Sequence, residues 1–261
     1  MSSTMHDFAY TTDYLEGVRD IIDNIESTQM DAIDQAVDIC ANSMLNRNVV
    51  HLFGSGHSRM AVEEMYPRYG SFAGFHPMVE LSLTNHHAVV GSNGQRQAMF
   101  LENVEGFGKV IVSNFHYGEH DSIIIFSHSG TGNVVVDIAL EMKERGIPVI
   151  AVTSLAHSRL SAAKHSSGKK LYELADVVID NCAPPGDAMV KIDNLETPVG
   201  PGSTIGNTVI VNLIKCKLAR KLTEQGQPPK VLTSALVVGE EKAKQLFEGS
   251  YEEYWAKTRY L

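Results

Sequence analysis

The sequence predicts an α/β fold built around a mainly parallel sheet. Apolar runs of strand length alternate along the chain with segments whose apolar residues recur at helical spacing. Two of those runs lead directly into loops of glycine and hydroxyl residues that open a helix. Such alternation favours right-handed crossovers between neighbouring parallel strands. A chain of 261 residues is long enough for one large core, so we expect a single domain over residues 1–261.

The first elements are a helical hairpin and a strand. Apolar residues at helical spacing over residues 14–46 predict two helices, with Ser27 and Thr28 placed to cap the second. The apolar run 48–53 then predicts a buried strand, followed by a helix over 58–69 that ends near a proline and a glycine. We expect this hairpin to pack on the sheet or on a second copy of the chain.

The remaining elements continue the alternation. We expect a short strand at 77–83, helical structure at 98–115, and a second buried strand at 122–126. After these we expect a helix at 134–145, strands at 148–153 and 176–180, a long helix from 203 to about 226, and a C-terminal helical arm.

Composition limits the partners and the compartment. A formal net charge of −9 argues against broad binding of nucleic acid, which requires a basic face. The three cysteines are far apart, a pattern that favours a reducing compartment. No segment has transmembrane length and the first residues lack a signal-peptide pattern, so we expect a cytoplasmic protein with no membrane partner.

The two strand–helix loops are the strongest functional signal. The first is Gly54-Ser55-Gly56-His57-Ser58, and the second is Ser127-His128-Ser129-Gly130-Thr131-Gly132-Asn133. Each offers backbone N–H groups, hydroxyl donors and the positive end of a helix, all of which favour an anion. Because two parallel strands carry these loops to one edge of the sheet, the sequence predicts a single phosphorylated ligand there.

Three other glycine-loop motifs do not fit. Arg59 and Val135 stand where a dinucleotide-binding loop requires its third glycine. Neither loop has the lysine of a P-loop, and the second loop begins with Ser127 where a nucleophile elbow begins with glycine.

The Ser127-His128-Ser129-Gly130 loop after an apolar strand resembles the signature of the sugar isomerase (SIS) domain. The 54–58 loop is similar to the other ligand loop of that domain, and the resemblance covers about residues 30–225. It implies a doubly wound α/β fold that binds phosphosugars, with the phosphate on the second loop. Within the family, the chain resembles a bacterial branch similar to phosphoheptose isomerase and N-acetylmuramic acid 6-phosphate etherase.

The resemblance also implies the binding residues. They are Gly54, Ser55, Gly56, His57 and Ser58 in the first loop, Ser127, His128, Ser129, Gly130, Thr131 and Asn133 in the second, and Ser203 at the start of the long helix. Gly132 departs from the family, whose members often have serine or threonine there. Thr131 or Asn133 would then supply the missing donor.

Sugar phosphate isomerisation requires a carboxylate base and often an imidazole for ring opening. Glu64, in the helix after the first loop, and Glu80 are the candidate bases, and His165 is the candidate acid. Family isomerases often carry a histidine on the long C-terminal helix, and residues 205–221 contain none. The expected function is an aldose–ketose sugar phosphate isomerase. The alternatives are a non-catalytic sugar phosphate sensor and a lyase or etherase acting on an amino-sugar phosphate.

We expect no cofactor and no metal. The pairs His86-His87 and His116/His120 are the nearest approach to a metal motif, but Gly118 lies between the latter two and weakens a helical site. The amphipathic hairpin and the aromatic C-terminal segment suggest a homodimer or homotetramer.

Overall fold

The computed structural model describes residues 10–84 and 94–261, and its centre is a parallel sheet of five strands. The strands are β1 (Val50–Gly54), β2 (Phe75–Pro77), β3 (Ser122–Phe126), β4 (Val149–Thr153) and β5 (Val177–Asp180). They lie in the order β2-β1-β3-β4-β5, and every neighbouring pair is parallel. The predicted α/β fold with a parallel sheet is confirmed.

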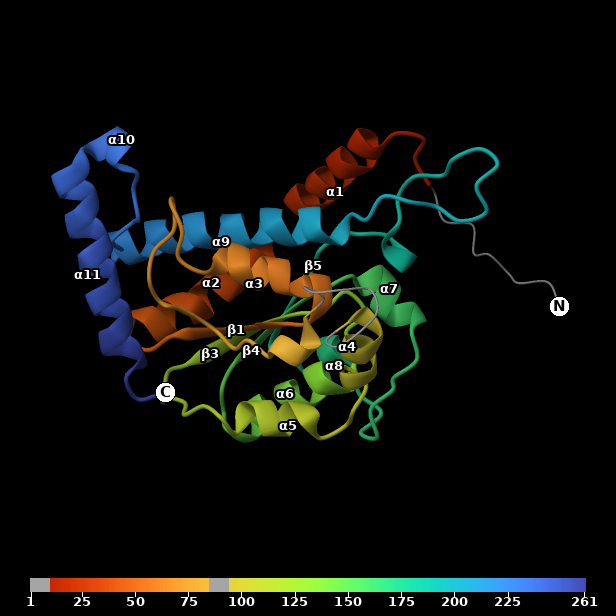
Figure 1. Cartoon of the computed structure of the whole chain (residues 1–261), viewed down its shortest axis with the longest axis horizontal. Coiled ribbons are helices and arrows are strands. Elements are labelled where there is room, and N and C mark those ends of the chain that lie inside the picture. The colour runs from red at the N-terminus through yellow and green to blue at the C-terminus, as the bar shows by residue number, and fades with distance from the viewer. Residues whose placement is uncertain (1–9, 85–93) are drawn as a thin grey trace.

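Helices cover both faces of the sheet (Figure 1). They are α1 (Tyr14–Thr28), α2 (Met30–Leu45), α3 (Arg59–Met65), α4 (Gln95–Leu101), α5 (Phe107–Val112), α6 (Asn133–Glu144), α7 (Leu155–Leu160), α8 (Leu171–Leu174), α9 (Ser203–Glu224), α10 (Ala235–Val238) and α11 (Glu240–Thr258). In Figure 1, α1, α2, α3 and α9 lie above the sheet, α5 and α6 lie below it, and α10 and α11 cover one end.

The alternation of side chains along each strand produces two apolar layers. In β3, Ile124 and Phe126 join the layer under α2, α3 and α9, whereas Ile123 and Ile125 join the layer over α5 and α6. All four side chains are fully buried, since successive residues of a strand point to opposite faces. Burial on both faces explains why these strands are continuous apolar runs rather than alternating ones.

Two local expectations were wrong. Ser27 and Thr28 do not cap α2, because Gln29 occupies that position and both hydroxyls donate back into α1, Ser27 to the carbonyl of Asp23 and Thr28 to that of Asn24. The short strand lies at Phe75–Pro77 rather than 77–83, because the Glu80 carboxylate accepts from the N–H of Ser82 and caps a 3₁₀ turn.

The helical segment expected at 98–115 is two helices, α4 and α5. Gly106, with φ of +89°, marks the boundary between them. Such a dihedral favours glycine because it lies in the left-handed region.

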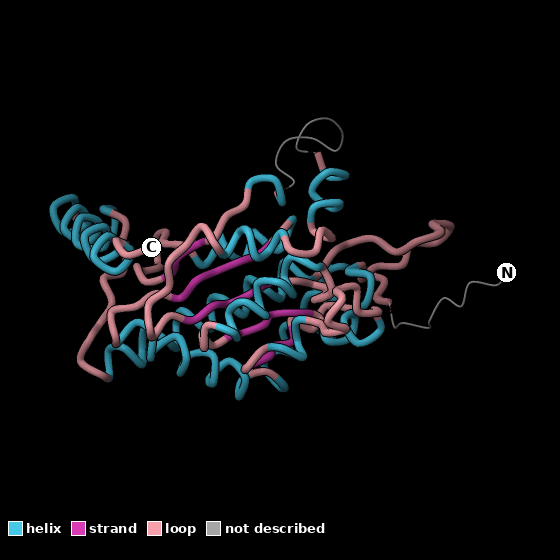
Figure 2. The backbone as a smooth tube through the Cα atoms, turned by 90° about the horizontal axis from the view of Figure 1, so that it is seen from below, coloured by secondary structure: helices cyan, strands magenta, loops and turns pink. Residues whose placement is uncertain are grey.

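The strand order determines where the chain leaves the sheet. β1 and β3 are neighbours, yet α3 follows β1 onto one face and α6 follows β3 onto the other. Figure 2 shows the strands side by side with loops gathered at their ends. Gly54 pairs in register with Phe126, so the two strands end level with each other. Open parallel sheets bind ligands at such a switch point, outside the carboxyl ends of the strands.

Within the described residues, no helix is both long enough and apolar enough to cross a bilayer.

Candidate functional site

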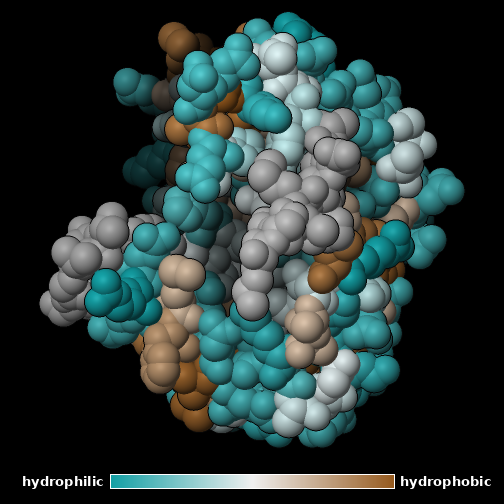
Figure 3. Space-filling model, turned by 90° about the vertical axis from the view of Figure 1, so that its right-hand side faces the viewer, coloured by the Kyte–Doolittle hydropathy of each residue, from teal (hydrophilic) through white to brown (hydrophobic). Residues whose placement is uncertain are grey.

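The two glycine–hydroxyl loops meet at a cavity of about 260 Å³ beside the β1–β3 boundary. Its lining residues are Ser55, Ser58, Glu102, Ser127, His128, Ser129, Gly132, Val134, Val135 and His157. None of them is a lysine or an arginine. Figure 3 views the end of the molecule toward which the strands run, where hydrophilic surface is interrupted by hydrophobic patches. The volume of this loop cavity is just below the ~300–1,000 Å³ typical of ligand pockets, so the cavity suits a small polar molecule.

The first loop turns sharply out of β1. Gly54 has no space for a side chain, because a Cβ atom there would lie 2.7 Å from the carbonyl oxygen of Ser58. Gly56 adopts a φ of +53°, which favours glycine, and Ser58 N–H closes the turn on the carbonyl of Ser55 at 3.0 Å. This turn brings Ser55 and Ser58 to the cavity wall.

The second loop orients its own hydroxyl groups. The Oγ of Ser127 accepts from the N–H of Gly130 at 3.1 Å, and the Oγ of Ser129 accepts from the N–H and the hydroxyl of Thr131 at 3.3 and 3.1 Å. Each serine oxygen therefore accepts at least one hydrogen bond from the loop, which leaves its own hydrogen to be donated elsewhere. The N-terminus of α6 follows at once, with the positive end of its dipole directed at the same place.

Two histidines form another part of the wall. His128 and His157 pack edge to face, with ring centroids 4.6 Å apart. Burial lowers the pKa of His128 to about 4, an effect to which His157 adds and which the charge of Asp187 opposes. Burial also lowers the pKa of His157, and the charge of Asp187 again opposes that shift. Both rings are therefore neutral at pH 7. Both ring nitrogens of His128 are buried without a hydrogen-bond partner among the described residues.

Glu102 is the carboxylate of this cavity. It lies just after α4, and its main-chain oxygen accepts from the N–H of Val134 in the first turn of α6. Burial raises its pKa above the ordinary value, although a hydrogen bond with Ser55 and the charge of Lys164 oppose that shift. A carboxylate whose pKa is raised toward neutrality suits proton transfer.

Glu64, the first predicted base, does not line the cavity. Its carboxylate contacts Arg68 at 2.6 Å, the Asn212 amide at 3.2 Å and Lys215 Nζ at 3.4 Å. Burial alone would raise the pKa of Glu64, but these partners hold it below its usual value. Glu64 therefore faces α9 and ties α3 to it.

The other predicted catalytic residues also lie outside the cavity wall. The Glu80 carboxylate binds the N–H and the hydroxyl of Ser82. His165 is buried, with Nε2 3.2 Å from the Asp137 carboxylate and Nδ1 2.8 Å from the Ser167 hydroxyl. These contacts order the loop before α8.

The structure brings some of the predicted binding residues to the cavity and not others. Ser55, Ser58, Ser127, His128 and Ser129 line the cavity.

Gly54, Gly56 and Gly130 shape the two loops. The buried Thr131 orients Ser129, and Asn133 donates to the carbonyl of Asn103. His57 is exposed and does not line the cavity. Ser203, the first residue of α9, binds the Asp187 carboxylate through both N–H and hydroxyl.

Sequence reasoning missed Glu102 and His157 as cavity residues. Neither belongs to a glycine-rich loop: Glu102 lies just after α4 and His157 lies in α7. The available signal was the position of His157 shortly after β4, because the carboxyl ends of parallel strands share one edge. No comparable signal marks Glu102.

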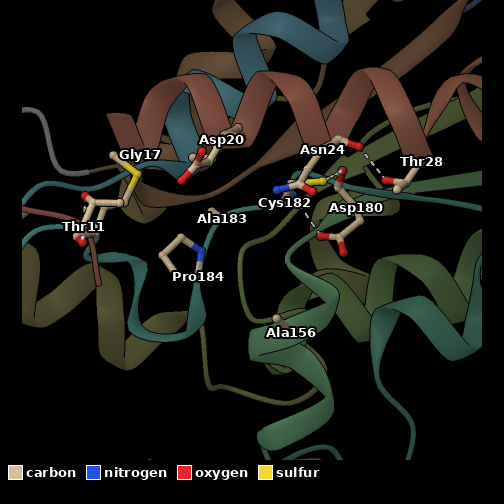
Figure 4. Close-up of a pocket in the computed structure, with 12 residues that line it drawn as sticks. Thr11, Gly17, Asp20, Asn24, Thr28, Ala156, Asp180, Cys182, Ala183 and Pro184 are labelled. Atoms are coloured by element: carbon tan, nitrogen blue, oxygen red, sulfur yellow. Dashed lines mark hydrogen bonds between the residues drawn. The ribbon is translucent and has the colours of Figure 1, made fainter. Parts of the chain in front are cut away.

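A second cavity, of about 390 Å³, lies between α1 and the segment after β5 (Figure 4). Asp20 and Asn24 approach it from α1, and Asp180, Cys182 and Pro184 line the other side. No residue of the two glycine–hydroxyl loops lines it. Two carboxylates, those of Asp20 and Asp180, line this second cavity and disfavour a phosphate there.

In residues 10–84 and 94–261 no group of three or more His, Cys, Asp or Glu side chains is arranged to hold a metal ion. The His86-His87 pair lies outside the described residues.

Comparison with known proteins identifies the family. A model of the SIS domain matches residues 13–154. A UPF0309 protein of Thermoanaerobacter pseudethanolicus is 36% identical, covering 88% of this chain and 92% of the relative. A UPF0309 protein of Oceanobacillus iheyensis is 34% identical, with coverages of 92% and 96%. The structure of a phosphoheptose isomerase from Francisella tularensis shares the fold, with a TM-score of 0.52 at 14% identity over 79% of this chain and 95% of that one. The chain belongs to the SIS domain family and groups with the UPF0309 proteins.

Proposed function

We propose that the loop cavity binds a phosphorylated sugar, with the phosphate held by the 127–132 loop and the N-terminus of α6. The orientation of Ser127 and Ser129 supports this assignment, since both hydroxyl oxygens accept from loop donors and leave their hydrogens for an anion. Hydroxyl and amide donors at a helix N-terminus bind phosphate without a cationic side chain. The family resemblance to a phosphoheptose isomerase agrees with a sugar phosphate as ligand.

The reaction that fits this cavity best is aldose–ketose isomerisation, with Glu102 as the base. The observation that carries this proposal is a half-buried carboxylate, with a raised pKa, on the wall that also holds the phosphate loop. Glu102 would remove the proton from the carbon next to the carbonyl and return it to the former carbonyl carbon. The hydroxyl proton passes between the two oxygens, so the step neither gains nor loses atoms or electrons.

The test has two stages. Thermal shift against a panel of sugar phosphates first finds a ligand, and NMR in D2O then follows exchange of the proton next to the carbonyl. We expect stabilisation and exchange with the native chain. Stabilisation without exchange would instead identify a sensor. Release of a substituent from the sugar would identify a lyase. No stabilisation by any sugar phosphate would overturn the ligand class.

The base is tested with matched variants. Glu102→Gln should retain binding and lose exchange, because the amide keeps the shape of the side chain but cannot accept the carbon-bound proton. Glu64→Gln and Glu80→Gln make the same change outside the cavity and should retain exchange. If exchange is retained in Glu102→Gln but lost in Glu64→Gln or Glu80→Gln, the base is the residue changed in that variant and not Glu102.

A further inference from the structure

His157 is held in one protonation form by a backbone contact. The N–H of Gly186 lies 3.0 Å from Nδ1 of His157. A backbone N–H can only donate, so Nδ1 must present a lone pair to it. The single ring proton of the neutral imidazole then belongs to Nε2. Because Nδ1 is occupied by Gly186, Nε2 is the ring nitrogen that remains for a ligand in the cavity lined by His157.

The turn that carries Gly186 is anchored to the start of α9. The Asp187 carboxylate accepts from the N–H of Gly202 at 3.0 Å, and from the N–H and the hydroxyl of Ser203 at 2.8 and 2.6 Å. Asp187 adopts a φ of +54°, a left-handed conformation that is unfavourable for a non-glycine residue. Three hydrogen bonds at the beginning of a 22-residue helix offset that cost and hold the Gly186 amide in place.

We propose that His157 donates its Nε2–H to a carbonyl or hydroxyl oxygen of the bound sugar, and that Asp187 is the positioning residue that maintains this tautomer. This inference rests on the proposed function for its ligand, but the tautomer itself is a property of the free protein. The groups that face His157 are the His128 ring, the Asp187 carboxylate and the Gly186 amide. Burial lowers the pKa of His157 and the Asp187 charge opposes that shift, whereas the Gly186 amide selects the nitrogen that bears the proton.

The chemical consequence is a division of labour between His157 and Glu102. A neutral imidazole polarises a carbonyl by hydrogen bonding and stabilises the oxyanion that forms when a carboxylate base removes the neighbouring proton, a role known for neutral histidine in another isomerase. The electron pair of the broken C–H bond enters the new C–C double bond, and the carbonyl oxygen takes the negative charge beside Nε2–H. The neighbouring hydroxyl then passes its proton to this oxygen and becomes the new carbonyl, while Glu102 returns the carbon-bound proton to the former carbonyl carbon.

The tautomer is tested without a ligand. In the full chain labelled with ¹⁵N-histidine, the His157 signals, assigned by their loss in His157→Gln, should show a protonated Nε2 and an unprotonated Nδ1 at pH 7. A protonated Nδ1, or a ring charged at pH 7, would overturn the proposal. Asp187→Ala should give a mixture of tautomers. Asp187→Asn, which retains an oxygen for the Gly202 and Ser203 amides, should restore the single form and guards against a variant that fails to fold.

The ligand contact is tested by comparing two ligands. For a sugar phosphate that stabilises the native chain, His157→Leu should weaken binding by about 2- to 10-fold, the value of one neutral hydrogen bond. It should leave the affinity for inorganic phosphate unchanged. Equal weakening of both would place His157 at the phosphate and overturn the contact. If no sugar phosphate binds, the proposed function fails while the tautomer measurement still decides the role of Asp187.

Discussion

The hydroxyl of Tyr260 donates a hydrogen bond to Oδ1 of Asp121, at 2.7 Å. Asp121 immediately precedes β3 and is buried, and its carboxylate also accepts from the N–H of Val49 and the N–H of Gly118. The second oxygen lies 3.0 Å from Nε2 of the buried His51. The end of the chain is therefore fastened at the amino edge of the sheet, opposite the glycine–hydroxyl loops.

Tyr260→Phe should lower the free energy of unfolding by about 1–3 kcal/mol, because it removes a hydrogen bond to a charged, buried acceptor. Urea denaturation measures the loss. Tyr251→Phe, at an exposed position of α11, is the matched control and should have little effect. Since Tyr260 lies at the other edge of the sheet from the cavity, ligand affinity should not change. A loss of affinity without a loss of stability would contradict this assignment.

Acidification should destabilise the fold between pH 6.5 and 4. Burial lowers the pKa of both His76 and His128 from 6.5 to about 4. In that interval the unfolded chain binds more protons than the folded chain, so the free energy of unfolding falls as the pH falls. His128→Gln should flatten the dependence by up to about 1.4 kcal/mol per pH unit. The exposed His116 offers a control, His116→Gln, and an equal flattening there would refute the burial argument.

Ser129→Ala should weaken binding of a sugar phosphate by about 10- to 150-fold, the cost of one charge-assisted hydrogen bond. Affinity for the same sugar without its phosphate should stay unchanged, because the proposed contact of this hydroxyl is with the phosphate. Isothermal titration calorimetry measures both. Ser113→Ala, on the exposed end of α5, is the control. Equal losses for the two ligands would show that Ser129 does not contact phosphate.

Gly130→Ala tests the shape of the second loop. Gly130 has φ of +62°, and a Cβ atom would lie 3.2 Å from Ser158 Oγ and 3.3 Å from both Leu171 Cβ and Thr153 Oγ1. Gly168 has a similar φ of +68° but no atom within 4 Å of its Cβ position. Both alanine variants carry the cost of the left-handed conformation, about 1–2 kcal/mol, but only Gly130→Ala adds a steric contact. We expect Gly130→Ala to unfold at a lower urea concentration and to bind sugar phosphate less well. Equal stability of the two would exclude crowding.

Glu64→Gln should lower stability by about 1–3 kcal/mol, because Lys215 is buried and would lose its anionic partner. Adding Lys215→Met should recover much of the loss, since no uncompensated charge then remains. Urea denaturation of the two single variants and the double variant measures the coupling. Purely additive losses would show that the pair does not act as a unit.

The two loops were predictable because their signal is local. A buried apolar strand followed by glycine and hydroxyl residues dictates both the turn and its chemistry within about ten residues. The parallel sheet followed from the alternation of strands and helices. The binding roles of Ser127 and Ser129 came from the family resemblance and stay predictions.

The catalytic candidates were harder because their placement depends on packing. Glu64 lies in the helix that follows the first loop, as predicted, but the side of α3 that carries it packs against α9 rather than the cavity. Spacing alone does not tell which side of a short helix faces a ligand. Glu102 reaches the cavity only because α4 ends against the first turn of α6. That contact joins residues 102 and 134, which no local pattern relates.

The pairing of β1 with β3 has a mechanical consequence. The two strands that precede β3 in the chain, β1 and β2, lie on one side of this pairing, and β4 and β5 lie beyond β3 on the other, so the pairing is the boundary between the earlier and later strands of the sheet. The two glycine–hydroxyl loops stand on opposite sides of it. A ligand bound by both loops would link β1 to β3 across this boundary. It should therefore slow the separation of the two strands and the exchange of the amide hydrogens between them.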